Sequence, residues 1–364
     1  MISPSEDEKN QIIEHLLHIK SDSEDVSWTS SKAYFRRYQS IFCPDEANDA
    51  VIQIDTPTLR THLDVLTFAK SLCDNHALSR GEMTRKWFAS RATTAAEMEH
   101  ISRAVVNIAF MIDCNERDYY PKGFDCSIPR AKWERDQSFL NFLETSFLPL
   151  QQRANAGVTL GDKASLKAWK LASRYGIRIR GTDNLLEHLL YDPRHRTLMI
   201  FHHVSYLRFH LRCSRNESLD MGFAESLALR TLPPQLLFET LLSLHYILFP
   251  IASRGGKRSI SLLKKCIRKQ HLDEELLSYE NVRRLPDDFT FKYWGGRLKT
   301  LQEVTKRPPP RNSLVSWFER HTSERNALTV AIIGLFLTAF LGLLGVIVGV
   351  LQLVIAWLAW KDGH

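Results

Sequence analysis

Histidine is the side chain whose type and spacing in this sequence most suggest chemistry. Five of the fourteen histidines fall within 23 residues: His188, His195, His202, His203 and His210. Two or three imidazoles with a carboxylate such as Glu187 or Asp192 make the donor set of many zinc and iron sites. Adjacent residues of a strand point to opposite faces, however, so His202 and His203 would not share one ion in a strand. The segment 188–210 is a candidate metal site, and histidines satisfied without an ion are the alternative.

Motifs of known catalytic chemistry are absent from the sequence. Gly255 and Gly256 precede Lys257 and Arg258 as in part of a phosphate-binding loop, but the earlier glycine and the following Ser or Thr are missing. There is also no dinucleotide-binding glycine pattern, no nucleophile elbow and no zinc-protease motif. We therefore assign no catalytic residue and no cofactor, and a non-enzymatic function is favoured over an enzyme of unrecognised type.

Basic side chains form two stripes at helical spacing, which are the sequence's candidate contact residues. The first stripe consists of Lys163, Lys167, Lys170 and Arg174. The second consists of Lys264, Lys265, Arg268 and Lys269, shortly after Lys257 and Arg258. In a protein tethered to a membrane, each such residue near an anionic surface contributes about 1 kcal/mol of attraction. The alternatives are a solvated helix face, an RNA or an acidic protein partner.

Composition places these residues in a folded, charge-asymmetric chain. The 364 residues are 44% hydrophobic and 24% charged, which excludes both a polytopic membrane protein and wholesale disorder. Residues 1–159 hold 18 basic and 23 acidic side chains, whereas residues 160–326 hold 29 basic and 17 acidic ones. The positive charge of the protein is thus concentrated in its second half.

Residues 327–360 contain no charged side chain and predict a single transmembrane helix. Trp357 and Trp360 stand where an interfacial aromatic belt belongs, and Lys361 closes the run. Small residues recur every four positions within it, a spacing that lets two helices approach closely. These residues of a candidate helix–helix contact, and hence of a candidate homo-oligomer, are Gly334, Thr338, Gly342, Gly345 and Gly349.

Basic residues before the span, against one after it, place the large N-terminal part in the cytosol. The N-terminus lacks the features of a signal peptide, so we expect a tail-anchored protein that inserts after translation. The span weakly favours the endoplasmic reticulum over the mitochondrial outer membrane. In the cytosol the sequon at Asn216 would stay unglycosylated, and the six scattered cysteines would stay reduced.

The preceding part reads as mainly helical with a few short strands. Helical periodicity with capping boxes at Ser79 and Thr94, followed by turn-forming residues 114–126, outlines a winged-helix-like segment. Later patterns predict strands at 177–180 and 197–202 and helices at 184–191, 204–213, 236–248 and 260–270. The expected parts are a polar segment 1–50, a winged-helix-like domain 51–155, a basic mixed domain 156–305, a Pro-rich basic linker 306–326 and the transmembrane helix 327–360.

A winged-helix outline raises the alternative of a membrane-tethered nucleic-acid binder. Its third helix would then enter the major groove. That helix presents Glu97 and Glu99, which would meet phosphate oxygens, and the first half of the chain is net negative. Nucleic-acid binding by this segment is therefore disfavoured, and contact with a protein is preferred.

Several segments, in one order, resemble a family of uncharacterised proteins from filamentous fungi. They are WERDQSF (133–139), GIRIRGTDNLLEHL (176–189), LMIFHH (198–203), LPP through LFP (232–250), YWGGRL (293–298), PRNSLVSWFER (310–320) and the C-terminal span. The resemblance covers roughly residues 58–360. It implies a cytosolic, mostly helical body with a membrane anchor, and it implies no activity, cofactor or catalytic residue.

Together these patterns favour a non-enzymatic, tail-anchored protein that presents a helical interaction or scaffold body to the cytosol. Its expected partners are a membrane, through one span and anionic headgroups, and an unidentified protein. A metal-dependent enzyme built on residues 188–210 is the first alternative, and a tethered nucleic-acid binder the second.

Overall fold

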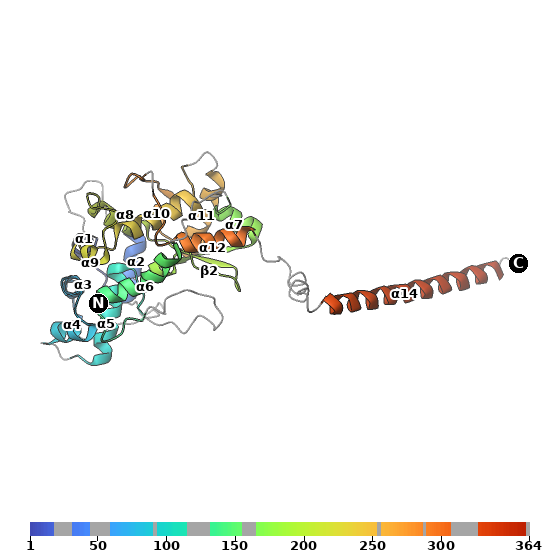
Figure 1. Ribbon diagram of the computed structural model, residues 1–364, viewed down its shortest axis with the longest axis horizontal. Helices are drawn as coiled ribbons and strands as arrows, with labels where there is room; N and C mark the ends of the chain where they lie inside the picture. The colour runs from blue at the N-terminus through green and yellow to red at the C-terminus, as the bar shows by residue number, and fades with distance from the viewer. Residues whose placement is uncertain are drawn as a thin grey trace. The chain divides into compact units, whose positions relative to one another are not determined.

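The chain forms two compact units, Met1–Arg307 and Pro308–His364, in a computed structural model (Figure 1). The structure describes residues 1–17, 31–43, 59–89, 93–114, 132–154, 165–252, 256–286, 289–306 and 327–361. The first unit, called the body below, contains both the acidic and the basic half of the sequence. The second contains the apolar helix α14 (Ala327–Lys361). The predicted class, mainly α with a few short strands and one C-terminal apolar helix, is confirmed.

Helices make up the first half of the body. They are α1 (Glu6–Leu16), α2 (Lys32–Phe42), α3 (His62–Asp74), α4 (Arg80–Phe88), α5 (Ala95–Phe110) and α6 (Phe139–Ala154). The capping boxes predicted at Ser79 and Thr94 are present at the starts of α4 and α5. The turn residues expected to form a wing fall mostly at 115–131, outside the described residues.

The second half adds a small sheet to further helices. Its elements are α7 (Ala168–Tyr175), β1 (Arg178–Thr182), η2 (Leu185–Glu187), β2 (Tyr191–Asp192), β3 (Thr197–Phe201), α8 (Val204–Cys213), α9 (Phe223–Ala228), α10 (Pro234–Leu242), the π-helical turn η3 (Ser243–Leu248), α11 (Lys257–Gln270), η4 (Glu274–Leu277) and α12 (Gly295–Lys306). The strand order is β1-β3-β2, with β1 and β3 parallel and β2 antiparallel to β3.

The helix expected at 184–191 is wrong. This segment is the 3-10 turn η2 followed by the start of β2, and Leu189 between them has a left-handed backbone with φ of 58°. The backbone turns there because Leu189 N–H donates to Met199 O and Leu190 O accepts from Met199 N–H, which pairs the segment with β3. The strands and helices predicted at 177–180, 197–202, 204–213, 236–248 and 260–270 are confirmed to within a few residues.

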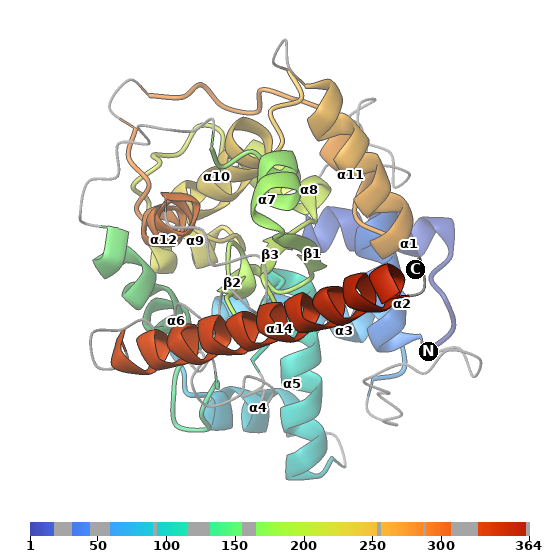
Figure 2. The same cartoon turned by 90° about the vertical axis from the view of Figure 1, so that its right-hand side faces the viewer.

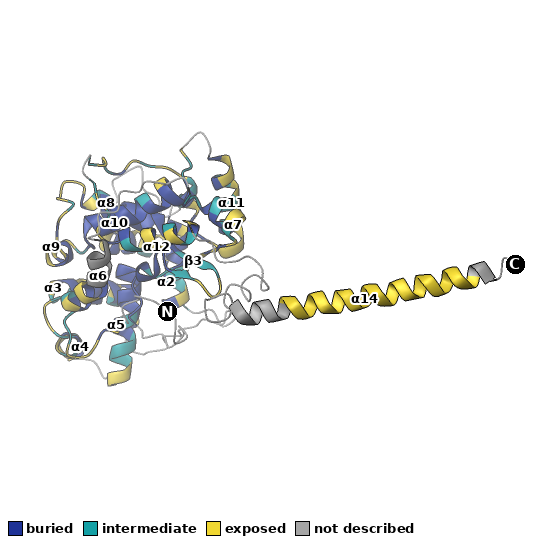
Figure 3. Ribbon diagram, turned by 45° about the vertical axis from the view of Figure 1, so that its right-hand side comes forward, coloured by how far each residue is buried: buried dark blue, intermediate teal, exposed yellow. Residues whose placement is uncertain are grey.

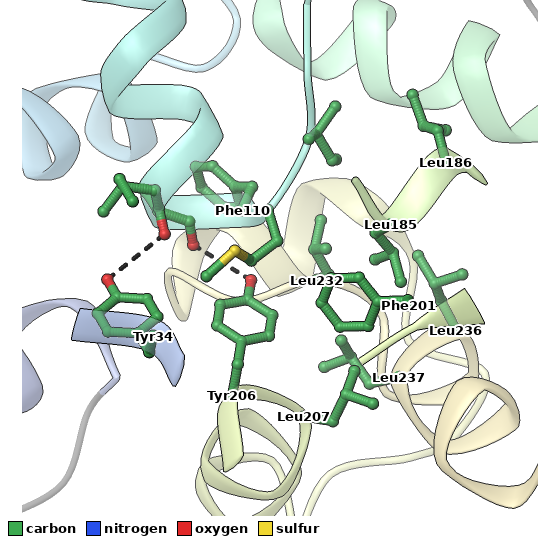
Figure 4. Packing of buried hydrophobic residues seen from close by; sticks show 14 of the residues in the cluster. Tyr34, Phe110, Leu185, Leu186, Phe201, Tyr206, Leu207, Leu232, Leu236 and Leu237 are labelled. Atoms are coloured by element: carbon green, nitrogen blue, oxygen red, sulfur yellow. Dashed lines mark hydrogen bonds between the residues drawn. The ribbon is translucent and has the colours of Figure 1, made fainter. Parts of the chain in front are cut away.

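The C-terminal end of α5 is buried at the centre of the body, where elements of both halves meet (Figure 4). The last carbonyls of a helix have no partner within the helix. Here the Tyr34 hydroxyl of α2 donates to Ile108 O at 3.4 Å, and the Tyr206 hydroxyl of α8 donates to Ala109 O at 3.1 Å. Met111 ends the helix in a left-handed conformation, and its carbonyl accepts the N–H of Leu185 at 2.8 Å. Three elements distant in sequence therefore depend on this one helix end.

A buried carboxylate joins α10 to the start of α12. Glu239 is fully buried, and its two oxygens accept N–H groups from the backbone of residues 292–294 and from the side chain of Gln235. Burial raises the pKa of Glu239 to about 7, although the four N–H donors favour the ionised form. The carboxylate thus fixes the chain that enters α12.

We expect Glu239→Gln to lower the free energy of unfolding of the body by about 1–3 kcal/mol at pH 5, because the amide brings two N–H donors, in place of the one O–H of the protonated acid, to a site lined by N–H donors. A folded-state pKa above the unfolded value means that the Glu239 contribution is fully present below about pH 4.3 and is lost as pH rises through about 7. The variant's deficit should therefore narrow between pH 5 and pH 8.

Urea unfolding followed by near-ultraviolet circular dichroism, on the full chain in detergent, measures this deficit. Glu303→Gln makes the same change on the exposed surface of α12 and is the control, expected to change stability by less than about 0.5 kcal/mol. Equal stability of Glu239→Gln and the native protein at pH 5 would contradict the assignment.

Candidate functional site at the ends of the parallel strands

Polar side chains gather where the two parallel strands end. Thr182 and Phe201 are paired as the last residues of β1 and β3, so the residues that follow them leave the sheet at the same edge. Those residues are Asp183, His202 and His203. The carboxyl edge of parallel strands is where open α/β sheets bind ligands, which makes this group the candidate site.

Both imidazoles contact the same carboxylate oxygen. Asp183 Oδ1 lies 3.1 Å from His202 Nε2 and 2.8 Å from His203 Nε2, and the two rings stack with centroids 4.2 Å apart. The expectation that His202 and His203 point to opposite faces is wrong, because β3 ends at Phe201 and strand alternation does not extend to them. Asp183 is the partner that the sequence reading missed.

A cation completes the surroundings of Asp183. An Arg37 guanidinium nitrogen lies 3.6 Å from Asp183 Oδ2, and Arg37 also donates to the Asn107 side chain at the end of α5. Burial raises the pKa of Asp183, but the hydrogen bonds from His202 and His203 outweigh burial and hold it well below its usual value. The carboxylate is therefore ionised at physiological pH.

The backbone around His202 fixes its tautomer. Its Nδ1 lies 3.2 Å from the backbone nitrogen of Asp273, which can only donate. Nδ1 must then accept, so the proton of the neutral ring sits on Nε2 and points at Asp183. The Asp273 carboxylate in turn accepts the N–H and the hydroxyl of Ser205 at 2.9 and 2.8 Å, which caps the N-terminus of α8.

His203 is buried in the same cluster with one ring nitrogen unused. Its Nε2 donates to Asp183, whereas its Nδ1 has no hydrogen-bond partner among the described residues. Burial, followed by the nearby His202, lowers the pKa of His203, so the ring is neutral at physiological pH. A buried Nδ1 without a partner is consistent with a structural role for His203, in which the hydrogen bond from Nε2 to Asp183 holds the ring.

A metal ion at this cluster would conflict with these hydrogen bonds. The three donor atoms lie within 4.8 Å of one another, which is close enough for one ion. Coordination through His202 Nε2 would move the ring proton to Nδ1, where it would meet the Asp273 N–H instead of the acceptor that normally supports a ligating histidine. Arg37 would also place a positive charge beside the ion. The residues present fit a hydrogen-bonded cluster better than a metal centre.

The absence of a side chain at Gly181 lets Leu272, which follows α11, pack against the cluster of Asp183, His202 and His203. A Cβ at Gly181 would overlap Leu272 Cδ2 and would lie 3.1 Å from His202 Cδ2. Next to it, the Gln270 carboxamide accepts from Gly181 N–H and donates to Ile179 O, each at 2.9 Å, and so satisfies the outer edge of β1. The end of α11 is thereby held against the sheet and the site.

The remaining histidines of the predicted cluster lie apart from the site. His188 is buried with both nitrogens bonded, to the Ser243 hydroxyl at 2.7 Å and to Phe201 N–H at 3.1 Å, and burial holds its pKa well below the usual value. His210 Nδ1 contacts the Thr231 hydroxyl at 3.1 Å. His195 is exposed and contacts Asp192 at 2.5 Å. None of the three belongs to the group of potential ligands found among the described residues.

The two predicted basic stripes lie on neighbouring helices. Lys167 immediately precedes α7, which carries Lys170 and Arg174, and α7 packs against α11, which carries the whole second stripe. Lys163 lies outside the described residues. The structure therefore joins two stripes that are about ninety residues apart in the sequence.

The small residues of α14 lie along an open helix. Nothing lies within 4 Å of where a Cβ would stand at Gly334, Gly342, Gly345 or Gly349. The Thr338 hydroxyl donates to Gly334 O at 2.8 Å, within the helix itself. Contact between two copies of α14 through this stripe stays a prediction.

Sequence reasoning missed Asp183, Arg37, Asp273 and Glu239. A signal for Asp183 existed, because it follows the turn-forming Gly-Thr pair at the end of one predicted strand, as His202 follows another. Glu239 also had a signal, because it is the one carboxylate in the apolar segment 236–248. The roles of Arg37 and Asp273 depend on contacts across 146 and 71 residues, respectively, and no local pattern marks them.

No protein-family model, curated protein or solved structure matches this chain.

We expect Asp183→Asn to lower the free energy of unfolding by about 1–2 kcal/mol at pH 7.5, since the half-exposed charge is partly screened by solvent. The folded-state pKa of Asp183 lies below its unfolded value, so its contribution is present above about pH 4 and is lost as pH falls further. Asp74→Asn, at an exposed position of α3, is the matched control. A deficit in Asp183→Asn that persisted unchanged at pH 3 would contradict this account.

We also expect removal of metal ions to leave the body unchanged. Dialysis of the purified full chain against EDTA should not move its urea midpoint, and elemental analysis should find less than one zinc or iron per chain. The opposite result, one ion per native chain that is absent from Asp183→Asn, would establish a metal centre at Asp183, His202 and His203.

Proposed function

We propose that this protein is a single-pass, tail-anchored membrane protein whose body, Met1–Arg307, is a non-enzymatic interaction or scaffold module on the cytosolic side. A membrane tether raises the effective concentration of whatever the body binds, which is a function that needs no chemistry. The resemblance to fungal proteins of the same organisation belongs to this proposal.

The observation that carries the proposal is the surface of α14. Its segment Gly334–Leu358 is 25 residues long with a mean hydropathy of 2.6, and none of its most apolar window is buried (Figure 3). Leucine, isoleucine, valine and phenylalanine side chains face outward all around it. Water disfavours such a helix, whereas a bilayer core about 30 Å thick accommodates it, because 25 residues of helix span roughly 37 Å.

The candidate site supports a non-enzymatic body. An active site needs groups that are free to meet a substrate. The polar atoms of Asp183 and His202 are instead engaged with each other, with Arg37 and with the backbone of Asp273. His203 is completely buried.

Charge supports the orientation. The linker and the end of the body carry Lys306, Arg307, Arg311, Arg320 and Arg325, against Lys361 after the span. The positive-inside rule then places the body in the cytosol. The endoplasmic reticulum is the membrane we favour for this anchor.

Extraction and protease protection test the proposal on the full chain with an N-terminal epitope tag. We expect the protein to stay in membranes at alkaline pH and the tag to be digested in intact vesicles. Release into the soluble fraction would overturn the anchor, and a protected tag would overturn the orientation.

Two substitutions in α14 supply the control. Leu344→Arg with Val348→Arg should release the protein, because each arginine costs about 2.5–3.5 kcal/mol on insertion scales. Leu344→Ala with Val348→Ala changes the same positions without charge and should remain membrane-bound.

A further inference from the structure

The helices α7 and α11 lie side by side in the body (Figure 2). Their packing joins the two basic stripes into one surface, called the α7–α11 face below. The Arg258 guanidinium of α11 lies 4.8 Å from the centre of the Trp169 ring of α7, and Lys170 Nζ lies 5.8 Å from the same ring. This cation–π contact makes the outer surfaces of the two helices continuous.

The cations of this face point outward. The exposed ones are Arg174, Lys257, Arg258, Lys264, Lys265, Arg268 and Lys269. On α11, Lys257, Lys264 and Arg268 lie on one side at helical spacing, opposite the buried Leu263 and Cys266. The helix is thus held by its apolar side while its charged side is presented to solvent.

Neither helix supplies a counter-charge. The segments Ala168–Tyr175 and Lys257–Gln270 contain no acidic residue. Among the described residues, no cation of α7 or α11 forms a salt bridge with a carboxylate. The charge of the face is therefore available to an external anion.

From these observations we propose that the α7–α11 face binds the phosphate-bearing headgroups of anionic phospholipids in the bilayer that holds α14. Binding is electrostatic and involves no insertion of the body. The inference rests on the proposed function, since it takes α14 to be embedded in that bilayer.

The chain itself argues for lipid as the occupant. Residues 307–326 connect the body to α14, and twenty residues reach at most roughly 70 Å when fully extended. The tether therefore keeps the body within reach of the charged headgroups of the same bilayer, and polybasic segments that meet such a surface are attracted by anionic lipid. The tether makes this encounter intramolecular, whereas an RNA or an acidic protein would have to be recruited from solution.

Aromatic exposure argues against single-stranded nucleic acid as the occupant. Proteins that bind single strands stack bases on open aromatic side chains. Among the residues of the body that the structure describes, the exposed aromatic ones are Tyr246 and Tyr279, which lie outside both helices, and Trp169 is half-buried beneath Arg258. The face offers charge without a stacking platform.

Lysine footprinting tests the proposal on the full chain in nanodiscs of phosphatidylcholine, with or without about 30% phosphatidylserine. After brief acetylation, mass spectrometry reads the reactivity of each lysine. We expect Lys257, Lys264, Lys265 and Lys269 to react at least about threefold more slowly in the anionic discs, and about 0.5 M salt to reverse the difference. Lys70 and Lys86, exposed on α3 and α4, should react equally in both.

Charge reversal provides matched variants. Lys264→Glu, Lys265→Glu and Arg268→Glu together should abolish the protection of Lys257 and Lys269. Lys70→Glu, Arg85→Glu and Lys86→Glu reverse the same number of exposed charges on α3 and α4 and should leave it intact.

The outcomes separate this inference from the proposed function. Failure of the chain to enter either disc would overturn the anchor. Incorporation with equal lysine reactivity in both discs would overturn lipid binding alone. Equal lysine reactivity in both discs, together with protection by an added RNA oligonucleotide, would overturn it in favour of a nucleic acid.

Discussion

The buried end of α5 is the constraint on which the body depends. A helix can end inside a protein only if its last carbonyls find donors, because an unpaired buried carbonyl costs free energy comparable to a lost hydrogen bond. Tyr34 and Tyr206 provide two of these donors from elements far apart in the sequence, and Leu185 N–H pairs with the carbonyl that follows. The acidic and basic halves of the chain are consequently parts of one core, and neither half completes this helix end alone.

The same solution, a buried polar group that pairs with a free backbone group, recurs at three other joints of the body. Glu239 fixes the entry to α12, Asp273 caps α8, and His188 links the Phe201 N–H at the end of β3 to the Ser243 hydroxyl of the π-helical turn. These three buried polar groups are thus committed to joints between elements. This explains why a region rich in histidine and carboxylate, which reads as chemistry in the sequence, serves architecture in the fold.

Sequence predicted what local physics determines. The capping boxes at Ser79 and Thr94 are four-residue patterns, so α4 and α5 begin where expected. The segment 184–191 has helical periodicity, yet it pairs with β3 and turns at Leu189, because Met199 and Ser243 offer it partners that no local pattern reveals. The sequence marked part of the candidate site, namely its histidines. The contact of Asp183 with them could not be predicted, because it requires that β1 and β3 are parallel and end together.

The charge on α11 favours an external role, because none of its cations forms a salt bridge with a carboxylate in the part of the chain that the structure describes. Like charges four residues apart, as at Lys264 and Arg268 or Lys265 and Lys269, destabilise a helix by about 0.2–0.5 kcal/mol for each pair. The rest of the body pairs many of its cations with carboxylates, as Arg208 with Glu275 and Arg212 with Glu280. A helix that forgoes such pairs and instead relies on Leu263, Cys266 and Gln270 to stay in place retains its full positive potential. An anionic surface outside the body, as proposed for the α7–α11 face, would make use of that potential.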